Sequence, residues 1–268
     1  MPCEGSASTI RQDRVATLLT SLTRRQFFKA GVLAVASLVL PPSPDYAASG
    51  RRLLAVPFHY QRHSLTCEIA ALRMAAEYHG EVWAEDDLLK LMPVDKRQPR
   101  FEGGNLVWAD PNLVFPGNFR GWQLYRGGLR EHPERTRRQL WGYGLHAPAI
   151  ADVAVHIGLA AELFDQVEAA YAAIDLGRVP IVIVPDGGRV QVVRWQWHTP
   201  QGEPVTVLNA EHSIVVRGYD DQTVWVNDPK GKVWSYPRDR FERAFALLRS
   251  GVAIGSACMV SPCKFRPI

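Results

Sequence analysis

Between Pro180 and Tyr236 the chain contains five short runs of β-branched and aromatic residues, which constrain the fold more than any other feature. The runs read IVIV, RVQVVRWQW, HSIVVRGYD, TVWVND and GKVWSY, and segments containing Gly, Asp, Asn or Pro separate them. Such runs are typical of antiparallel strands. SIVVRGYDDQTVWVND predicts a hairpin that turns at Asp220 and Asp221. We therefore expect an antiparallel sheet in this part of the chain.

Helical patterns come before these strands. They are Cys67 to His79, WAEDDLLKLMPV and HAPAIADVAVHIGLAAELF, and one further helix, PRDRFERAFALLRSG, follows the sheet. Helices first and sheet second predict an α+β fold. The segment from Phe101 to Gly142 is rich in glycine and polar residues, and we expect it to be a long loop with a function or with mobility.

The N-terminal segment TRRQFFKAGVLAVASLVLPPSPDYAASG resembles a twin-arginine export signal, with paired Arg24 and Arg25 and with Lys29 before an apolar run. The alternative is a basic, amphipathic first helix. The apolar run is shorter than the roughly 18 residues that a spanning helix needs. We predict that residues 1–48 are a signal peptide and linker and that residues 49–268 form one domain. The protein is then exported by the twin-arginine machinery, extracytoplasmic, and free of the membrane after signal removal.

Charge and cysteine content limit the remaining possibilities. The 268 residues are 47% hydrophobic and carry a formal net charge of +4, which gives no reason to predict nucleic acid as a partner. Removal of the signal leaves Cys67, Cys258 and Cys263, an odd number, which in an exported protein suggests a free reactive thiol or an intermolecular bridge. Cys258 and Cys263 are close enough in sequence to form a bridge, so Cys67 is the candidate for the free thiol. The alternative is three reduced cysteines without a role.

Cys67 lies at the expected start of a helix, in SLTCEIAALRMAAEYHG. Unpaired N–H groups and the helix dipole lower the pKa of a thiol at such a position. Thr66 is placed to cap the helix, and Glu68 stands in its first turn. The alternative interpretation of Cys67 is a small buried hydrophobic residue.

A cysteine nucleophile needs a base, and the base needs an orienting partner. His212 opens the strand HSIVVRGYD, and Asp228 ends the next strand, TVWVND. Neighbouring strands of one hairpin can hold an imidazole and a carboxylate together. Taken separately, His212 has the alternative role of a histidine at a surface edge, and Asp228 that of a turn residue before Pro229.

VPFHYQRHSLTCEIAALRMAAEYHG, followed far downstream by EHSIVVRGYDDQTVWVNDPKGKVWSY, resembles the papain-like cysteine peptidases of the bacteriocin-leader-processing (double-glycine) type and their exported relatives. In that family a glutamine precedes the cysteine, and a histidine and an aspartate follow near the C-terminal sheet. This chain has the same order in Gln61, Cys67, His212 and Asp228. The interval 212 − 67 = 145 lies inside the range of about 130–150 for papain-type enzymes.

The resemblance implies a papain-like fold over residues 49–268, with Cys67 on the N-terminal helical part and His212 and Asp228 on the C-terminal sheet. It implies hydrolysis of a peptide or protein substrate without cofactor or metal. Cys67 is the nucleophile, His212 the general base, and Asp228 fixes the imidazole. The Gln61 side-chain amide and the Cys67 backbone N–H stabilise the oxyanion.

Two departures from the family pattern leave alternatives open. Many members have glycine after the cysteine, where this chain has Glu68, and a carboxylate directed inward opposes thiolate formation. The chain also lacks the transporter domains that leader-processing peptidases often carry. The alternatives are an acyl or peptidyl transferase or isopeptidase on the same fold, and a catalytically inactive peptide-binding module.

Three further patterns in the sequence are weaker. His63, Cys67 and His79 lack the spacing of a metal site, so we predict no metal. RGGLREHPERTRR, residues 126–138, is a basic cluster with two glutamates that we interpret as a solvated loop. Four further side chains either line a substrate cleft or pack within their own loop, and we favour packing: Trp108, Trp122, Tyr143 and His146.

Overall fold

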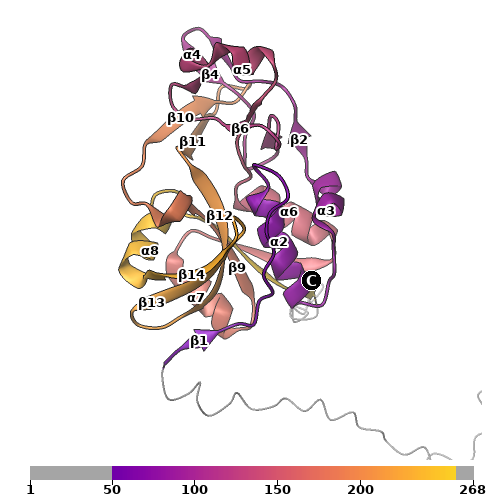
Figure 1. Cartoon of the computed structure of the whole chain (residues 1–268), viewed down its shortest axis with the longest axis vertical. Coiled ribbons are helices and arrows are strands. Elements are labelled where there is room, and N and C mark those ends of the chain that lie inside the picture. Colours follow the sequence, from indigo (N-terminus) through magenta and orange to yellow (C-terminus); the bar gives the residue numbers. More distant parts are fainter. Residues whose placement is uncertain (1–49, 258–268) are drawn as a thin grey trace, which may run out of the picture. The chain divides into compact units, whose positions relative to one another are not determined.

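A seven-stranded antiparallel sheet forms the centre of residues 50–257, the part of the chain that the computed structural model describes (Figure 1). The predicted signal segment, Cys258 and Cys263 lie outside these residues. The strands follow in the order β14 (Lys232–Pro237), β13 (Thr223–Asp228), β12 (Glu211–Tyr219), β9 (Val179–Pro185), β15 (Ser250–Ser256) and β8 (Leu159–Phe164). The short β1 (Arg52–Leu53) pairs with the end of β12.

Helices cover both faces of this sheet (Figure 1). On one face lie α2 (Cys67–Tyr78), α3 (Glu85–Leu91) and α6 (Ala147–His156), and on the other α7 (Val167–Asp175) and α8 (Arg238–Phe245). The central strand β9 is apolar throughout because each side of it is covered. Ile181 and Ile183 pack with the first group of helices, and Val182 and Val184 pack with the second. Each such burial contributes about 1.5–3 kcal/mol before entropy is counted.

A second, smaller sheet has the order β11 (Pro204–Leu208), β10 (Arg194–His198), β4 (Asn105–Val107) and β3 (Arg100–Glu102). Around it lie two strand pairs, β2 (Val94–Asp95) with β5 (Phe115–Pro116) and β6 (Trp122–Gln123) with β7 (Trp141–Gly142). Three short helices complete the described part: α4 (Gly128–Glu131), α5 (Pro133–Arg137) and η1 (Asp186–Gly188).

The segment from Phe101 to Gly142 is not the long structureless loop that we predicted. It contains short strands and helices, and it contributes to an aromatic core of its own. The largest buried side chains of this third core are Trp108, Trp141, Tyr143 and Trp197. Because each aromatic ring buries a large apolar surface, a few short strands and helices are enough to form an ordered core. Our prediction relied on the glycine and polar content of the segment and did not take this burial into account.

The α+β prediction is confirmed, since helices and an antiparallel sheet form the fold. The hairpin prediction is also confirmed, because β12 and β13 pair antiparallel and β13 has the predicted bounds. GLAAELF, however, is a strand and not the end of a helix. Gly158 has φ +84°, which ends α6, and the following residues form β8 against β15. Pairing overrides the helix propensity of these residues. Within residues 50–257 no helix has the length and apolarity needed to cross a bilayer.

Candidate active site

Cys67 is the first residue of α2, as predicted, and Thr66 occupies the capping position. The predicted side-chain cap is wrong, because the Thr66 side chain forms no capping hydrogen bond. Its Oγ1 donates instead to Glu85 Oε1 at 2.6 Å. The hydroxyl therefore ties the start of the helix to α3, and the helix N-terminus keeps its own N–H groups for other partners.

His212 and Asp228 meet on the first sheet. His212 Nε2 and Asp228 Oδ1 are 2.6 Å apart, and both side chains are buried. Asp228 Oδ1 also accepts a hydrogen bond from the Lys230 backbone N–H at 2.8 Å. Burial opposes ionisation of Asp228, but the hydrogen bond with His212 and the Lys230 N–H outweigh it and lower the pKa of the carboxyl. The other ring nitrogen of His212, Nδ1, is buried and has no hydrogen-bond partner among the described residues.

Cys67 lies beside the same strand, because α2 packs on β12. The Ser213 backbone N–H donates to Cys67 Sγ, with N and Sγ 3.5 Å apart, so the thiol contacts the residue that follows His212. The structure thus brings a thiol, an imidazole with one free nitrogen, and a carboxylate into one buried region. Cys67 is a free, buried cysteine, and the whole residue is only 7% exposed.

The surroundings of Cys67 do not lower its pKa, contrary to the expectation from its place at the helix start. Burial raises the pKa of the thiol well above its ordinary value, and the charge of Glu68 raises it further. The Ser213 N–H and the charge of Lys230 act in the opposite direction but are weaker. The free thiol is therefore protonated at neutral pH, and a thiolate requires a proton acceptor close by.

Glu68 is directed inward and forms a buried pair of carboxyls with Glu211, the residue before His212. Glu68 Oε1 accepts the Leu145 N–H at 2.9 Å, whereas Glu68 Oε2 and Glu211 Oε1 have no hydrogen-bond partner in the described part of the chain. Both carboxyls lie against Gly144, where a Cβ would come within 2.4 Å of Glu68 Oε1. Burial, assisted by the charge of Glu211, raises the pKa of Glu68 to about 7.

Glu211 has two partners on its other oxygen. Tyr143 Oη donates to Glu211 Oε2 at 2.7 Å, and His146 Nε2 lies 3.2 Å from the same atom. Tyr143 and His146 are buried, as we favoured, and so is Trp108, whereas Trp122 is exposed. Two of the side chains that we assigned to loop packing thus contact the residue next to His212.

Gln61 is held by its own loop. Its Nε2 donates to the His63 carbonyl at 2.7 Å and to the Ser64 carbonyl at 3.0 Å, so both amide hydrogens are used. Its backbone N–H donates to the Pro229 carbonyl at 2.8 Å, which ties this loop to the residue after Asp228. The oxyanion role of Gln61 stays a prediction, and it requires the amide to give up one of these carbonyls.

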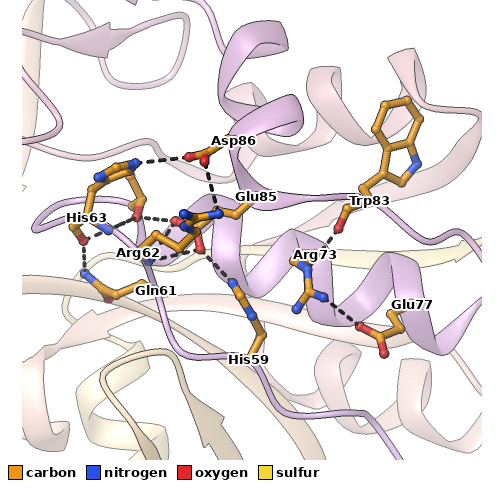
Figure 2. A network of polar contacts seen from close by, with 10 residues as sticks. His59, Gln61, Arg62, His63, Arg73, Glu77, Trp83, Glu85 and Asp86 are labelled. Atoms are coloured by element: carbon orange, nitrogen blue, oxygen red, sulfur yellow. Dashed lines mark hydrogen bonds and ion pairs between the residues drawn. The ribbon is translucent and has the colours of Figure 1, made fainter.

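Glu85 fixes the loop that carries Gln61, and no sequence pattern pointed to this role. Figure 2 shows this carboxylate with His59, Arg62 and their neighbours. Glu85 accepts hydrogen bonds from the Arg62 N–H and the Thr66 hydroxyl, and His59 Nε2 lies 2.7 Å from its Oε2. In sequence Glu85, two positions after Trp83, looks like an ordinary first-turn helix residue. Only the fold places the loop on it.

His63 and His79, the two histidines considered for a metal site, have different and unrelated partners. His63 Nε2 contacts Asp86 Oδ1 at 3.1 Å, and His79 Nε2 contacts the Ile254 carbonyl at 2.9 Å. No group of three or more His, Cys, Asp or Glu side chains within residues 50–257 is arranged to hold a metal ion.

Comparisons with known proteins agree with this fold. The model of the Peptidase_C39 like family matches residues 53–252. A crystal structure described as a C39-like peptidase from Bacillus anthracis superposes with a TM-score of 0.62 at 21% identity and covers 76% of this chain and 96% of its own, which shows a shared fold. The peptidase domain of Streptococcus ComA, a bifunctional ABC transporter, has a TM-score of 0.44 at 15% identity over 75% of this chain and 98% of its own.

The uncharacterized protein YvpB of Bacillus subtilis is 32% identical over 90 residues. These residues are 33% of this chain and 35% of YvpB, so the chain spans about a third of the length of this relative. The family match covers far more of the chain, from β1 into β15, and includes every residue of the site. The chain therefore belongs to the Peptidase_C39 like family.

Proposed function

We propose that the protein is an exported cysteine peptidase in which Cys67 is the nucleophile, His212 the general base and Asp228 the orienting carboxylate. The family and the fold support a peptidase function. One observation carries the assignment of roles: Asp228 binds Nε2 of a buried His212 and leaves Nδ1 without a partner, next to the strand residue that contacts the thiol. This arrangement orients one ring nitrogen and leaves the other for proton transfer.

In the proposed reaction the Cys67 S–H bond breaks and its proton moves to His212 Nδ1. The sulfur attacks the carbonyl carbon of a peptide bond, the C–N bond breaks, and His212 returns the proton to the leaving amine. Water then attacks the thioester carbon while His212 accepts its proton, the C–S bond breaks and the carboxylic acid leaves, and His212 returns the proton to the Cys67 sulfur. Asp228 stays ionised and stabilises the imidazolium throughout.

The high pKa of Cys67 makes the base essential. Because burial opposes a free thiolate, charge separation has to occur as a thiolate–imidazolium pair, stabilised by Asp228 and the Ser213 N–H. The oxyanion is stabilised by the Cys67 N–H, which belongs to the first turn of α2, and by the Gln61 amide after it leaves a loop carbonyl.

The same burial supports a second candidate function, a papain-like shell that binds peptides without cleaving them. A nearly inaccessible thiol beside an inward carboxyl is poorly suited to react. A transferase or isopeptidase shares the acyl-enzyme and differs only in the acceptor, so product analysis separates these activities from hydrolysis.

The test is incubation with a peptide library, with products identified by mass spectrometry. We expect Cys67→Ala and His212→Ala each to lower cleavage by roughly 10³-fold or more, because nucleophile and base act as one unit.

Asp228→Asn should retain more activity than His212→Ala, since an amide still accepts a hydrogen bond. Gln61→Ala should slow cleavage while Cys67 still reacts with iodoacetamide.

His156→Ala is the matched control, because it removes an exposed histidine from α6. If His212→Ala cleaves and alkylates like the parent protein, the assignment of the base is wrong. A parent protein that alkylates at Cys67 but leaves every peptide intact and forms no acyl transfer product supports the binding function instead.

A further inference from the structure

A cavity of about 930 Å³ lies in the region of the smaller sheet. Cys67, His212 and Asp228 are not among the residues that line it. Its walls come from β3, β4, β10, β11 and the segment around α4. In Figure 1 the labels α4, β4, β10 and β11 lie together in the upper part of the view. The cavity includes part of the basic cluster 126–138, which the proposed peptidase chemistry does not use.

All of the Arg, Lys, Asp and Glu residues that line this cavity are arginines, although the Glu131 carboxylate contacts the lining residue Tyr125 from outside the wall. Arg126, Arg130 and Arg194 line it, and none of the lining residues is Asp or Glu. Arg126 and Arg194 are exposed, and within residues 50–257 their guanidinium groups form no ion pair or hydrogen bond. The Arg130 guanidinium lies over the Phe101 ring, 5.4 Å from its centre, and has no carboxylate partner among these residues. Three cationic groups around a concave surface create a positive potential that attracts anions.

The aromatic part of the wall is held in place by the third core. The Trp195 ring packs edge-on against the fully buried Trp197, with centroids 5.5 Å apart. The Tyr125 ring packs in the same way against the buried Trp141 at 6.2 Å. Flat apolar surfaces beside free guanidinium groups suit a peptide that carries acidic side chains, because the walls contact the chain and the arginines bind carboxylates in a bidentate manner.

The cavity is connected to the strand that carries His212. The Arg126 backbone N–H donates to Asn209 Oδ1, and Gln123 Nε2 donates to the Glu211 carbonyl, both at 2.9 Å. Thr206 lines the cavity and precedes His212 by six positions. Six residues of chain span at most about 20 Å, so Thr206 and His212 lie within that distance of each other, and an extended peptide of comparable length is long enough to span from the cavity to the site of Cys67.

We propose that this cavity binds an acidic segment of the peptide substrate, with glutamate or aspartate side chains about six residues from the cleaved bond. The proposal rests on the proposed peptidase function for the identity of the ligand as substrate. Peptide binding at the cavity does not require the Cys67 thiol. A binding experiment therefore tests this proposal, and a cleavage experiment tests the peptidase function.

The probe is a fluorescein-labelled ten-residue peptide with four glutamates, and its control has glutamine at the same positions. Binding is measured by fluorescence anisotropy to the full chain carrying Cys67→Ala, so that cleavage cannot consume the probe. We expect the glutamate peptide to bind at least about tenfold more tightly than the glutamine peptide, and the difference to shrink as salt rises.

The protein variant for the test is Arg126→Gln/Arg194→Gln. Since both side chains are exposed and make no polar contact with the described residues, folding should persist, and circular dichroism checks it. The double variant should lose at least about tenfold in affinity for the glutamate peptide. Arg189→Gln removes one charge from another exposed position outside the cavity wall and should change the affinity less than about twofold.

Equal binding of the two peptides, or undiminished binding by the double variant, overturns the proposal. Vesicles of phosphatidylglycerol form a separate arm: if the double variant loses vesicle binding while the parent protein ignores the glutamate peptide, the cavity serves a membrane surface and the proposal is wrong. Absence of cleavage with retained, arginine-dependent peptide binding contradicts the peptidase function alone.

Discussion

Glu68 and Glu211 stand next to Cys67 and His212 in sequence, and the fold buries both carboxyls against Gly144. With the pKa of Glu68 raised to about 7, its charge changes in the physiological range. When Glu68 is ionised, its charge raises the pKa of the Cys67 thiol. The Cys67 thiol is therefore easier to deprotonate when the Glu68 carboxyl is protonated.

Replacing Glu68 by Gln should make Cys67 more reactive. The amide still accepts the Leu145 N–H but carries no charge, so the pKa of the thiol falls. We expect the pH profile of iodoacetamide alkylation at Cys67 to move by roughly one unit to lower pH. Glu77→Gln, at the other end of the same helix, is the control. An unchanged profile for Glu68→Gln would contradict this account of the site.

The same substitution should change how stability depends on pH. A carboxyl whose pKa is higher in the folded state binds its proton more tightly there, so it favours folding at low pH. For Glu68 this contribution is complete below about 4.5 and is lost as pH rises to about 7. Urea unfolding should show Glu68→Gln more stable than the parent protein at pH 8 but no longer so at pH 4. A parallel pH dependence of the two proteins would show that Glu68 is not a buried acid.

At the scale of elements, the buried Glu85 is an acceptor shared by several donors of the loop from His59 to Thr66. Glu85→Ala removes the acceptor of the Thr66 hydroxyl and the Arg62 N–H, and buried donors without partners are costly. We expect the free energy of unfolding to fall by about 2–4 kcal/mol. Guanidinium unfolding measures it. The control is Asp87→Ala, two positions further along α3, where the side chain pairs only with the exposed Lys90. Its free energy of unfolding should stay within about 0.5 kcal/mol of the value for the parent protein. Similar losses for both would show that Glu85 has no special role.

Elements with strong periodicity could be predicted from the sequence, and elements defined by partners could not. TVWVND is β13 with the expected bounds, because alternation and flanking turns fix a strand locally. GLAAELF has helical propensity and becomes β8 only because β15 lies beside it. The helix α7 and the strand β15 were not predicted. Their sequences, VEAAYAAID and SGVAIGS, are rich in small residues that carry little pattern.

The site was predictable where it follows from strand pairing. His212 and Asp228 were expected together because one hairpin carries both, and the structure places them 2.6 Å apart. The environment of Cys67 was not predictable in the same way. Its burial and the inward direction of Glu68 depend on the packing of α2 on β12 and on the Leu145 N–H, which no local pattern encodes.

For the whole molecule, the twin-arginine proposal makes a prediction about the full chain. Arg24→Lys with Arg25→Lys keeps both charges but removes the paired guanidinium groups. We expect the precursor of this double variant to stay inside the cell, while Arg11→Lys with Arg14→Lys leaves export unchanged. Immunoblots of the cell fraction and the exported fraction measure how much precursor and mature protein each contains. Undiminished export of the Arg24/Arg25 variant refutes the assignment.

Cys67 and His212 come from distant parts of the chain, on α2 and β12. During synthesis the ribosome therefore releases Cys67 long before His212 exists, and contacts of such long sequence separation form slowly. A nascent chain that ends before His212 has its cysteine without the imidazole or the carboxylate. Under the proposed roles, thiol chemistry at Cys67 therefore has to wait until β12 and β13 have been made and β12 has packed against α2.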